Sequence, residues 1–144
     1  MNSSDIQDAL IKTAVEKIDI DVPNWTFVAA RLFLYDLYHR VGIATYGVKG
    51  EAYRHLKDYI QFGIEAGRII PNLASGYDLD DLNSYIDPSR DFLFNYLGIK
   101  TLYDRYLLKN SKGEPIELPQ QMFMSIAMFL AQNEKDKQNK AKEF

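Results

Sequence analysis

Residues 86–131 read IDPSRDFLFNYLGIKTLYDRYLLKNSKGEPIELPQQMFMSIAMFLA and carry the strongest fold signals in the chain. Asp87 precedes a proline, which is favoured at the first helical position, so a helix is predicted here that Gly98 ends. Two short apolar stretches then flank an Asn-Ser-Lys-Gly turn, a pattern that predicts a small β-hairpin near residues 102–118. The next proline predicts another helix over 120–132.

The first forty residues predict two helices. A capping box of Ser4 and Gln7 predicts a helix over residues 4–18. Apolar residues recur every four positions along it, which predicts an inward face of Ile6, Leu10, Ala14 and Ile18, with Ile11 and Val15 beside it. Residues 25–40, which Asn24 is expected to cap, are apolar almost all round, as expected of a helix buried in a bundle.

The remaining segments predict short helices joined by loops. Residues 42–50 and 71–76 have the composition of loops, and helices are expected over 51–66 and 78–86. The polar tail from residue 133 is expected to fray or to continue as an exposed helix. The predicted fold class is therefore mostly α: a bundle of about six helices with one small β-hairpin.

Composition excludes several classes of function. The chain has 144 residues, 47% of them hydrophobic, and a formal net charge of −3, which gives no general attraction to nucleic acid or acidic membranes. It has no cysteine, which excludes disulfides, thiolate metal sites and cysteine nucleophiles. No apolar run approaches the roughly 20 residues that span a bilayer, and the first residues lack a signal-peptide pattern, so a cytoplasmic location is expected.

Three blocks of sequence carry a family resemblance. They are residues 6–12, residues 25–38 with Ala-Ala-Arg-Leu inside them, and residues 91–129. Nearly the whole chain resembles the N-terminal helical region of the large (alpha) subunit of class I ribonucleotide reductase, a ribonucleoside-diphosphate reductase. The resemblance implies three parts: the last helix of an ATP-cone-like module (1–19), the reductase N-terminal helical domain (20–132) and a polar tail (133–144).

The resemblance also implies a function. The parent enzymes reduce ribonucleotides to deoxyribonucleotides for DNA synthesis by thiyl-radical chemistry, in an α/β barrel that follows this region and holds the catalytic cysteines. Because this chain has no thiol, it is expected to be an N-terminal fragment, a structural and regulatory linker that is inactive alone. Its expected partners are the barrel of the same subunit and, through it, the radical-generating small subunit. No catalytic residue, metal or cofactor is expected in the chain itself.

Two residues are candidates for remnant contacts to ATP and dATP, the effectors of the parent enzymes. Ser3 matches the family's nucleotide-contacting hydroxyl at a helix start, where free N–H groups suit phosphate. The neighbouring Ser4 is better explained by capping. His39 aligns with a position near the end of the second helix where some members use lysine. The alternative for His39 is a surface histidine favoured by the helix dipole.

Other candidates have simpler explanations. Arg90 and Lys100 are candidates for docking onto the barrel, and solvated surface charge is an equal alternative. Capping is favoured over a metal site for five aspartates that straddle two helix starts: Asp78, Asp80, Asp81, Asp87 and Asp91. Core packing with a solvated hydroxyl is favoured over a radical relay for seven tyrosines: Tyr35, Tyr38, Tyr53, Tyr59, Tyr96, Tyr103 and Tyr106.

The sequence leaves two rivals to the reductase fragment. One is a free-standing helical protein-interaction module derived from the same region, which genomic context would distinguish. The other, a helix-turn-helix DNA-binding protein, is disfavoured because the chain is acidic and no helix has the composition of a recognition helix. An apolar docking face left uncovered also predicts a homodimer of the chain.

Overall fold

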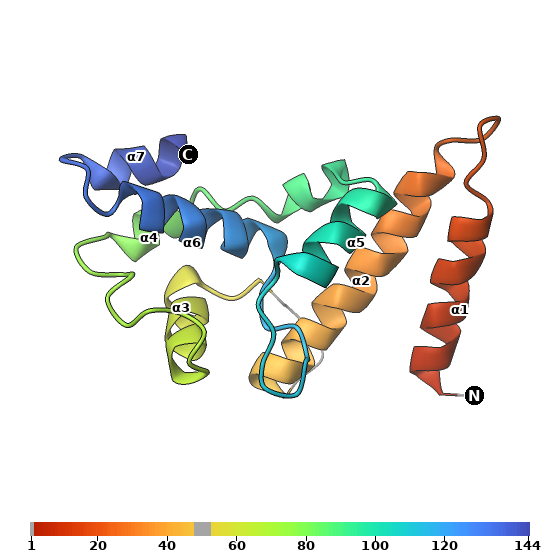
Figure 1. The fold of residues 1–144 in the computed structure, drawn as a ribbon, viewed down its shortest axis with the longest axis horizontal. Coiled ribbons are helices and arrows are strands. Elements are labelled where there is room, and N and C mark those ends of the chain that lie inside the picture. The colour runs from red at the N-terminus through yellow and green to blue at the C-terminus, as the bar shows by residue number, and fades with distance from the viewer. Residues whose placement is uncertain (1, 48–52) are drawn as a thin grey trace.

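The computed structural model describes residues 2–47 and 53–144. Within these ranges it has seven α-helices, one short 3-10 helix and no strand, which confirms the mostly-α prediction. In Figure 1 the long α2 crosses the molecule, with α1 on one side of it and α5 on the other. The elements are α1 (Ser3–Glu16), α2 (Trp25–Tyr46), α3 (Leu56–Glu65), α4 (Leu79–Asn83), η1 (Pro88–Leu93), α5 (Tyr96–Arg105), α6 (Pro119–Ala131) and α7 (Lys137–Glu143).

Two apolar cores hold these helices together, and α6 contributes to both. The first core lies between α2 and α5 and comprises Ile11, Ala30, Phe33, Leu34, Leu37, Val41, Ile99, Leu107, Leu118 and Met122. The second gathers α3, α4, α6 and α7 and comprises Leu56, Tyr59, Ile60, Ile69, Leu73, Leu82, Met124, Met128, Ala131 and Ala141. Because Met122 belongs to one core and Met128 to the other, α6 joins the two halves of the molecule.

The start of α1 differs from the predicted capping box. Asn2, not Ser4, precedes the helix, and its N–H donates to the Asp5 carboxylate at 2.9 Å. The side chain of Gln7, which was expected to reach back to the helix start, instead donates to the Leu32 carbonyl of α2 at 3.0 Å. An interhelical contact has therefore replaced the local one.

The buried face of α1 is also rotated from the predicted one. Ile11 and Ala14 are buried, whereas Ile6 and Leu10 are each 48% exposed. The four-residue repeat alone could not distinguish these neighbouring stripes, because both contain apolar residues. The inward stripe is the one that faces α2.

The next two helices have shifted boundaries. Helix α2 continues past the predicted end at residue 40, through a buried Gly42, and stops at Gly47, whose φ of 68° is left-handed. Helix α3 starts at Leu56, where the His55 ring accepts the Lys57 N–H at 3.2 Å. The predicted start of α3 at residue 51 lies outside the described residues.

The segment after residue 86 also differs from its prediction. Pro88 starts a 3-10 turn, and a second helix, α5, then runs through Gly98, which was expected to end the first. The Asn95 side chain caps α5 by accepting the Gly98 N–H at 2.7 Å, and a Cβ on this glycine would lie 3.2 Å from the capping oxygen. Gly98 therefore permits a close cap instead of breaking a helix.

The predicted hairpin is wrong in its first strand. Residues 102–105 belong to α5, and the described chain forms one isolated bridge between Lys109 and Pro115 instead of a sheet. The turn itself is present, because the Asn110 N–H donates to the Glu114 carbonyl at 2.9 Å and Gly113 has a φ of 81°. The local turn signal was correct, and the strand signal was overridden by the helix.

The tail from residue 133 forms the docked helix α7 after a short turn. Ala141 is buried in the second core, Lys137 donates to the Ser75 carbonyl at 2.6 Å, and Lys142 pairs with Asp81 at 2.6 Å. None of the described helices is long and apolar enough to cross a membrane.

Candidate functional site

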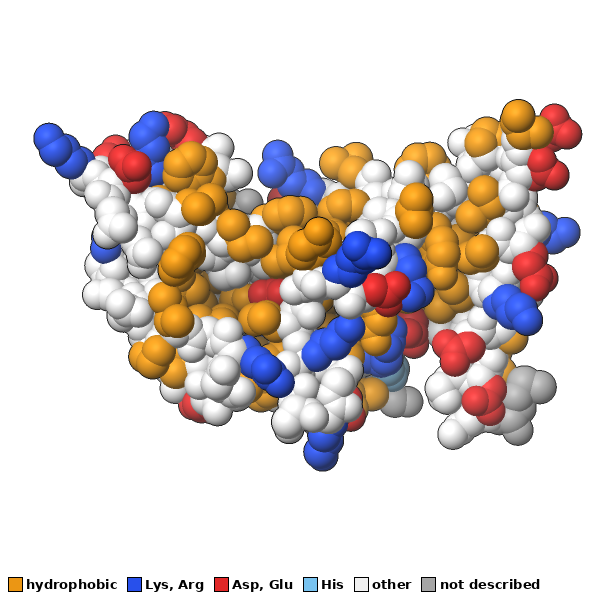
Figure 2. All heavy atoms as spheres, viewed as in Figure 1, with side chains coloured by type: hydrophobic (Ala, Val, Ile, Leu, Met, Phe, Trp, Pro, Cys, Tyr) orange, Lys and Arg blue, Asp and Glu red, His pale blue; other side chains and the backbone are white. Residues whose placement is uncertain are grey.

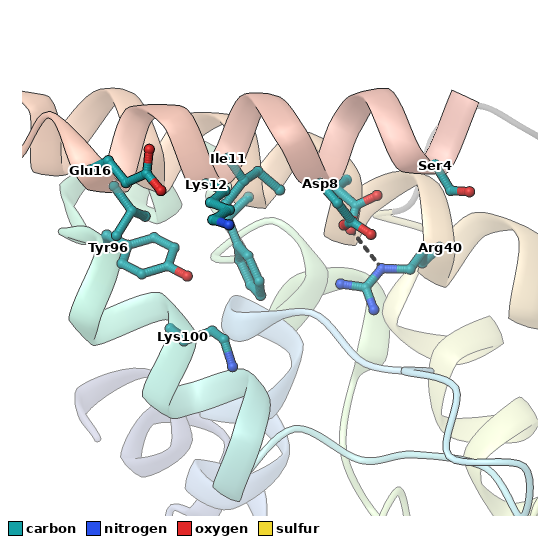
Figure 3. A pocket seen from close by; sticks show the side chains of 11 residues that line it. Ser4, Asp8, Ile11, Lys12, Glu16, Arg40, Tyr96 and Lys100 are labelled. Atoms are coloured by element: carbon teal, nitrogen blue, oxygen red, sulfur yellow. Dashed lines mark ion pairs between the residues drawn. The ribbon is translucent and has the colours of Figure 1, made fainter. Parts of the chain in front are cut away.

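A cleft of about 590 Å³ lies where α1 faces α2 and α5. Figure 3 shows its side chains, with one stripe of α1 facing Arg40 on α2 and Tyr96 and Lys100 on α5. The lining residues are Ser4, Asp8, Ile11, Lys12, Val15, Glu16, Phe33, Asp36, Arg40, Tyr96 and Lys100. The α1 residues recur at spacings of three and four, which places them on one helix face.

The charges of the cleft are balanced. Its lining includes three carboxylates and three cations. Arg40 Nε lies 2.7 Å from Asp36 Oδ2, the ion pair dashed in Figure 3, and Lys100 Nζ lies 2.6 Å from Asp104 Oδ2. Because both pairs are partly exposed, each stabilises the fold only modestly. The cleft has no net charge that would attract an anion or a cation.

Aromatic rings form the wall beneath these charges. Phe33 meets Tyr96 and Tyr103 edge to face, with ring centroids 6.1 and 5.5 Å apart. Arg40 lies over the Tyr103 ring at 4.8 Å and donates to its hydroxyl at 2.9 Å. Aromatic and cation–π contacts of this kind stabilise helix packing. The cleft therefore has the chemistry of a helix–helix contact.

Neither of the two predicted nucleotide contacts lines this cleft. Ser3 is exposed in the first turn of α1, and it is Ser4 that faces the cleft. His39 is half-buried on α2, about two turns before that helix ends at Tyr46, so its expected place near a helix C-terminus was wrong. A remnant nucleotide contact at Ser3 and His39 stays a prediction.

Asp91, on η1, is a buried carboxylate with three hydrogen-bond donors. Its side chain is fully buried and accepts from the Tyr38 hydroxyl at 2.7 Å, the Tyr53 hydroxyl at 2.6 Å and the Gln120 amide at 2.8 Å. The Tyr53 hydroxyl in turn accepts the Gln120 backbone N–H at 3.0 Å. One carboxylate therefore joins α2, η1, α6 and the segment before α3.

A second buried carboxylate, Glu117, lies directly before α6. Its two oxygens accept from the Tyr59 hydroxyl on α3 and from the Leu108 N–H, the latter at 2.9 Å. Burial raises the pKa of Glu117 above its ordinary range, and burial likewise raises the pKa of Asp91 although three donors oppose it. Burial next to these carboxylates also raises the pKa values of Tyr53 and Tyr59.

The sequence contained a signal for one of these two groups. Glu117 is the single charge between Ile116 and Leu118, so burial of this segment requires hydrogen-bond donors for its carboxylate. Asp91 carries no such signal, and the sequence does not distinguish it from the aspartates that are predicted to cap helices. Two of that group do cap: Asp78 accepts the N–H groups of residues 80 and 81, and Asp87 accepts that of residue 89.

The tyrosines divide into buried and exposed sets. Tyr59 is buried, and Tyr38 and Tyr53 are half-buried against the first core and donate their hydroxyls to Asp91. Tyr35 and Tyr106 are 67% and 62% exposed, so the core prediction was wrong for these two.

The two predicted docking residues lie at different sites. Arg90 lines a groove beside α6, whereas Lys100 faces the α1 cleft.

These features define a mostly helical packing domain whose two buried carboxylates, Asp91 and Glu117, accept tyrosine hydroxyls inside the fold. Residues 92–144 match the family model of the ribonucleotide reductase all-alpha domain. The chain is 62% identical over all 144 residues to the ribonucleoside-diphosphate reductase subunit alpha of Helicobacter pylori, of which it covers 18%. It is 38% identical over 95% of its length to the subunit of the same name from Chlamydia muridarum, of which it covers 13%.

A more distant relative is the ribonucleoside-diphosphate reductase 1 subunit alpha of Escherichia coli, 29% identical over 92% of this chain, which covers 17% of that protein. The chain belongs to the ribonucleotide reductase large-subunit family and corresponds to its N-terminal region. It spans about a fifth of the length of the relatives that it matches.

Proposed function

We propose that this chain serves as the N-terminal helical part of a ribonucleoside-diphosphate reductase large subunit, whose whole reduces ribonucleotides to deoxyribonucleotides. The observation that carries the proposal is the 62% identity over the full chain to a named alpha subunit of which the chain covers 18%. The chain has no cysteine, so the thiol chemistry of the parent enzymes belongs to the other parts of the subunit.

Within that subunit the chain acts as a structural and regulatory linker. Helix α1 packs chiefly on α2 and stands at the edge of the molecule, as expected of the last helix of an ATP-cone-like module over residues 1–19 (Figure 1). Residues 20–132 then form the helical domain, and residues 133–144 the polar tail. ATP and dATP are the proposed effectors, with Ser3 and His39 as remnant contacts.

The proposed partners follow from the same assignment. The chain contacts the catalytic barrel of its own subunit directly and the radical-generating small subunit through it. A cytoplasmic location accords with these partners.

A chimera tests the proposal. This chain replaces the matched 18% of the Helicobacter pylori alpha subunit, and reduction of CDP is measured with the small subunit of that organism and a dithiol. We expect kcat/KM within roughly tenfold of the parent, a loss of less than about 1.4 kcal/mol in transition-state stabilisation. A soluble chimera that forms no dCDP would contradict the proposal.

The isolated chain provides the matched control. It should form no dCDP under the same conditions, because it supplies no thiol to generate the radical or deliver electrons. The rival function, a free-standing interaction module, predicts an inactive chimera and a chain that binds a partner unrelated to the reductase.

A further inference from the structure

Helix α7 binds the rest of the molecule largely through polar side chains. Its seven residues are fewer than the roughly 12–15 that make a helix even marginally stable alone, so it depends on its contacts. Ala141 is its buried residue, within the second core. In Figure 2 acidic and basic side chains gather over the position of α7, whereas hydrophobic side chains gather over that of α6.

The first two side chains of α7 bind the segment before and at the start of α4. Lys137 Nζ donates to the Ser75 carbonyl at 2.6 Å. The Gln138 side chain accepts the Asp78 N–H at 3.0 Å and donates to the Asp78 carbonyl at 3.1 Å. The same amide donates to Asp81 Oδ2 at 2.7 Å. The start of α7 is therefore hydrogen-bonded to two successive turns of another segment.

An ion pair holds the end of α7. Lys142 Nζ lies 2.6 Å from Asp81 Oδ2, the same oxygen that accepts from Gln138. The hydrogen bond from Lys142 holds the pKa of Asp81 below its ordinary value. Because Gln138 and Lys142 are four residues apart, they lie on one face of the helix. One carboxylate on α4 therefore binds both ends of α7.

These contacts are open to screening by salt. The side chains of Asp81 and Lys142 are 36% and 16% exposed. The Debye length falls from about 10 Å at 0.1 M salt to about 3 Å at 1 M, so partly exposed pairs weaken. By contrast, Asp91 and Glu117, which hold the start of α6, are 0% and 1% exposed. Salt should therefore loosen α7 before it affects α6.

Helix α7 also forms one wall of a groove. This groove, of about 530 Å³, lies between α6, η1 and α7, and its α7 side consists of Ala141, Lys142 and Phe144. Met124 lines it on the α6 side and is 8% exposed. Movement of α7 away from α4 would remove that wall and bring Met124 into contact with solvent.

We propose that α7 is a salt-sensitive strap that the Asp81 carboxylate closes over this groove. In the open state Gln138 and Lys142 leave Asp81, α7 loses its helical structure, and α6 and the two cores stay folded. The strap operates within the chain itself, so it does not depend on the proposed function.

Hydrogen exchange of the full chain tests the strap. The exchange rates of the α7 amides are compared in 0.05 and 1 M sodium chloride. We expect them to rise about two- to fivefold in high salt, which corresponds to a loss of up to about 1 kcal/mol from an exposed ion pair. The amides of α6 should not change. Salt-independent protection of α7, or an acceleration that α6 shares, would overturn the proposal.

A variant separates the ion pair from the hydrogen bond. Asp81→Asn removes the charge that Lys142 binds, but its side-chain oxygen can still accept from Gln138. At low salt it should speed exchange of α7 about two- to fivefold and remove most of the salt effect. Glu143→Gln is the matched control, because the 2.6 Å Lys140–Glu143 pair lies wholly within α7, and it should keep the salt effect. Loss of the salt effect in Glu143→Gln, or its persistence in Asp81→Asn, would refute the role of Asp81.

Methionine oxidation by dilute hydrogen peroxide reports the opening of the groove. Met124 lines the groove, whereas Met122, 7% exposed, belongs to the first core and is the internal standard. Asp81→Asn should raise the oxidation rate of Met124 relative to Met122 about two- to fivefold, in proportion to the population of the open state. An unchanged ratio, together with faster exchange of the α7 amides, would show that α7 frays without opening the groove and that it is not a strap.

Discussion

Helices α1 and α6 have nearly the same length but very different support. Helix α6 buries seven of its thirteen residues and contributes to both cores. Helix α1 buries two of its fourteen and packs chiefly on α2. Since short helices are marginal in isolation and depend on tertiary packing, the two should differ in how they unfold. We expect α6 to open only with the whole domain and α1 to open by itself.

The polar contacts sharpen the same contrast. Two buried carboxylates hold the N-terminal end of α6. Asp91 accepts from the Gln120 side chain in the first turn of the helix, and Glu117, directly before the helix, accepts the Leu108 N–H. Four polar residues of α1 (Ser4, Asp8, Lys12 and Glu16) line the open cleft, and a side-chain bond from Gln7 to the Leu32 carbonyl ties the helix to α2. Buried networks of this kind are costly to break, whereas partly solvated bonds are cheap.

The largest effect is expected from Met128→Ala on the buried side of α6. The side chain is fully buried in the second core, so truncation should cost about 2–5 kcal/mol of global unfolding free energy. Leu130→Ala, on the 58% exposed side of the same helix, should change it by less than about 0.5 kcal/mol. Urea unfolding measures both, and equal costs would contradict the assignment of the two faces.

The next effect separates the two tyrosines that bind Asp91. Tyr53→Phe removes a donor to the buried carboxylate and an acceptor of the Gln120 N–H, and should cost about 1.5–3 kcal/mol. Tyr38→Phe removes one donor and should cost less. Urea unfolding of both variants provides the comparison. A Tyr38→Phe variant that is less stable than Tyr53→Phe would show that the backbone bond contributes nothing.

Local signals in the sequence predicted α6 well. Its start at a proline and its apolar run place it at 120–132, and the structure has Pro119–Ala131. They failed between residues 94 and 105, because the Asn95 cap and the contacts of Ile99 in the first core override a glycine that usually ends helices. Helix boundaries depend on such tertiary contacts, which periodicity does not contain.

The candidate site was predictable only in part. Glu117 stands out as a lone charge in an apolar run, but its partner Tyr59 is 58 residues away in sequence. Asp91 joins residues from four separate segments, and nothing in the local pattern distinguishes it from the aspartates that cap helices. The family resemblance identified the parent enzyme, but it did not reveal that these carboxylates hold the domain together.

The third prediction uses pH to compare a buried with an exposed aspartate. Burial raises the pKa of Asp91 above its ordinary value of 3.8, so the folded state holds this proton more tightly than the unfolded state. The resulting stabilisation is fully present below pH 3.8 and is lost as the pH rises through the folded-state pKa. Asp91→Asn should therefore reduce the decline in stability as the pH rises above 3.8, because the Gln120 amide can rotate to present its oxygen to the new amide group.

Asp87 is the matched control for the pH experiment. It is exposed, and hydrogen bonds from the Ser89 side chain and backbone lower its pKa below 3.8. Its contribution is present above pH 3.8 and is lost as the pH falls, the opposite sign to Asp91. The unfolding free energies of Asp91→Asn and Asp87→Asn, measured at successive pH values, check these opposite signs. If the two asparagine variants alter the pH profile in the same direction, the internal role of Asp91 is wrong.

The smallest effect tests whether α1 opens independently. Gln7→Ala removes the bond to the Leu32 carbonyl of α2 and should cost about 1 kcal/mol. Thr13→Ala is the matched control, because the Thr13 hydroxyl donates at 2.8 Å to the Ala9 carbonyl of α1 itself. Hydrogen exchange should show faster opening of α1 amides in Gln7→Ala, no change in α6 amides, and neither effect in Thr13→Ala. If α6 amides exchange faster to the same extent, α1 and α6 unfold as one unit, and the difference in burial between the two helices does not translate into a difference in stability.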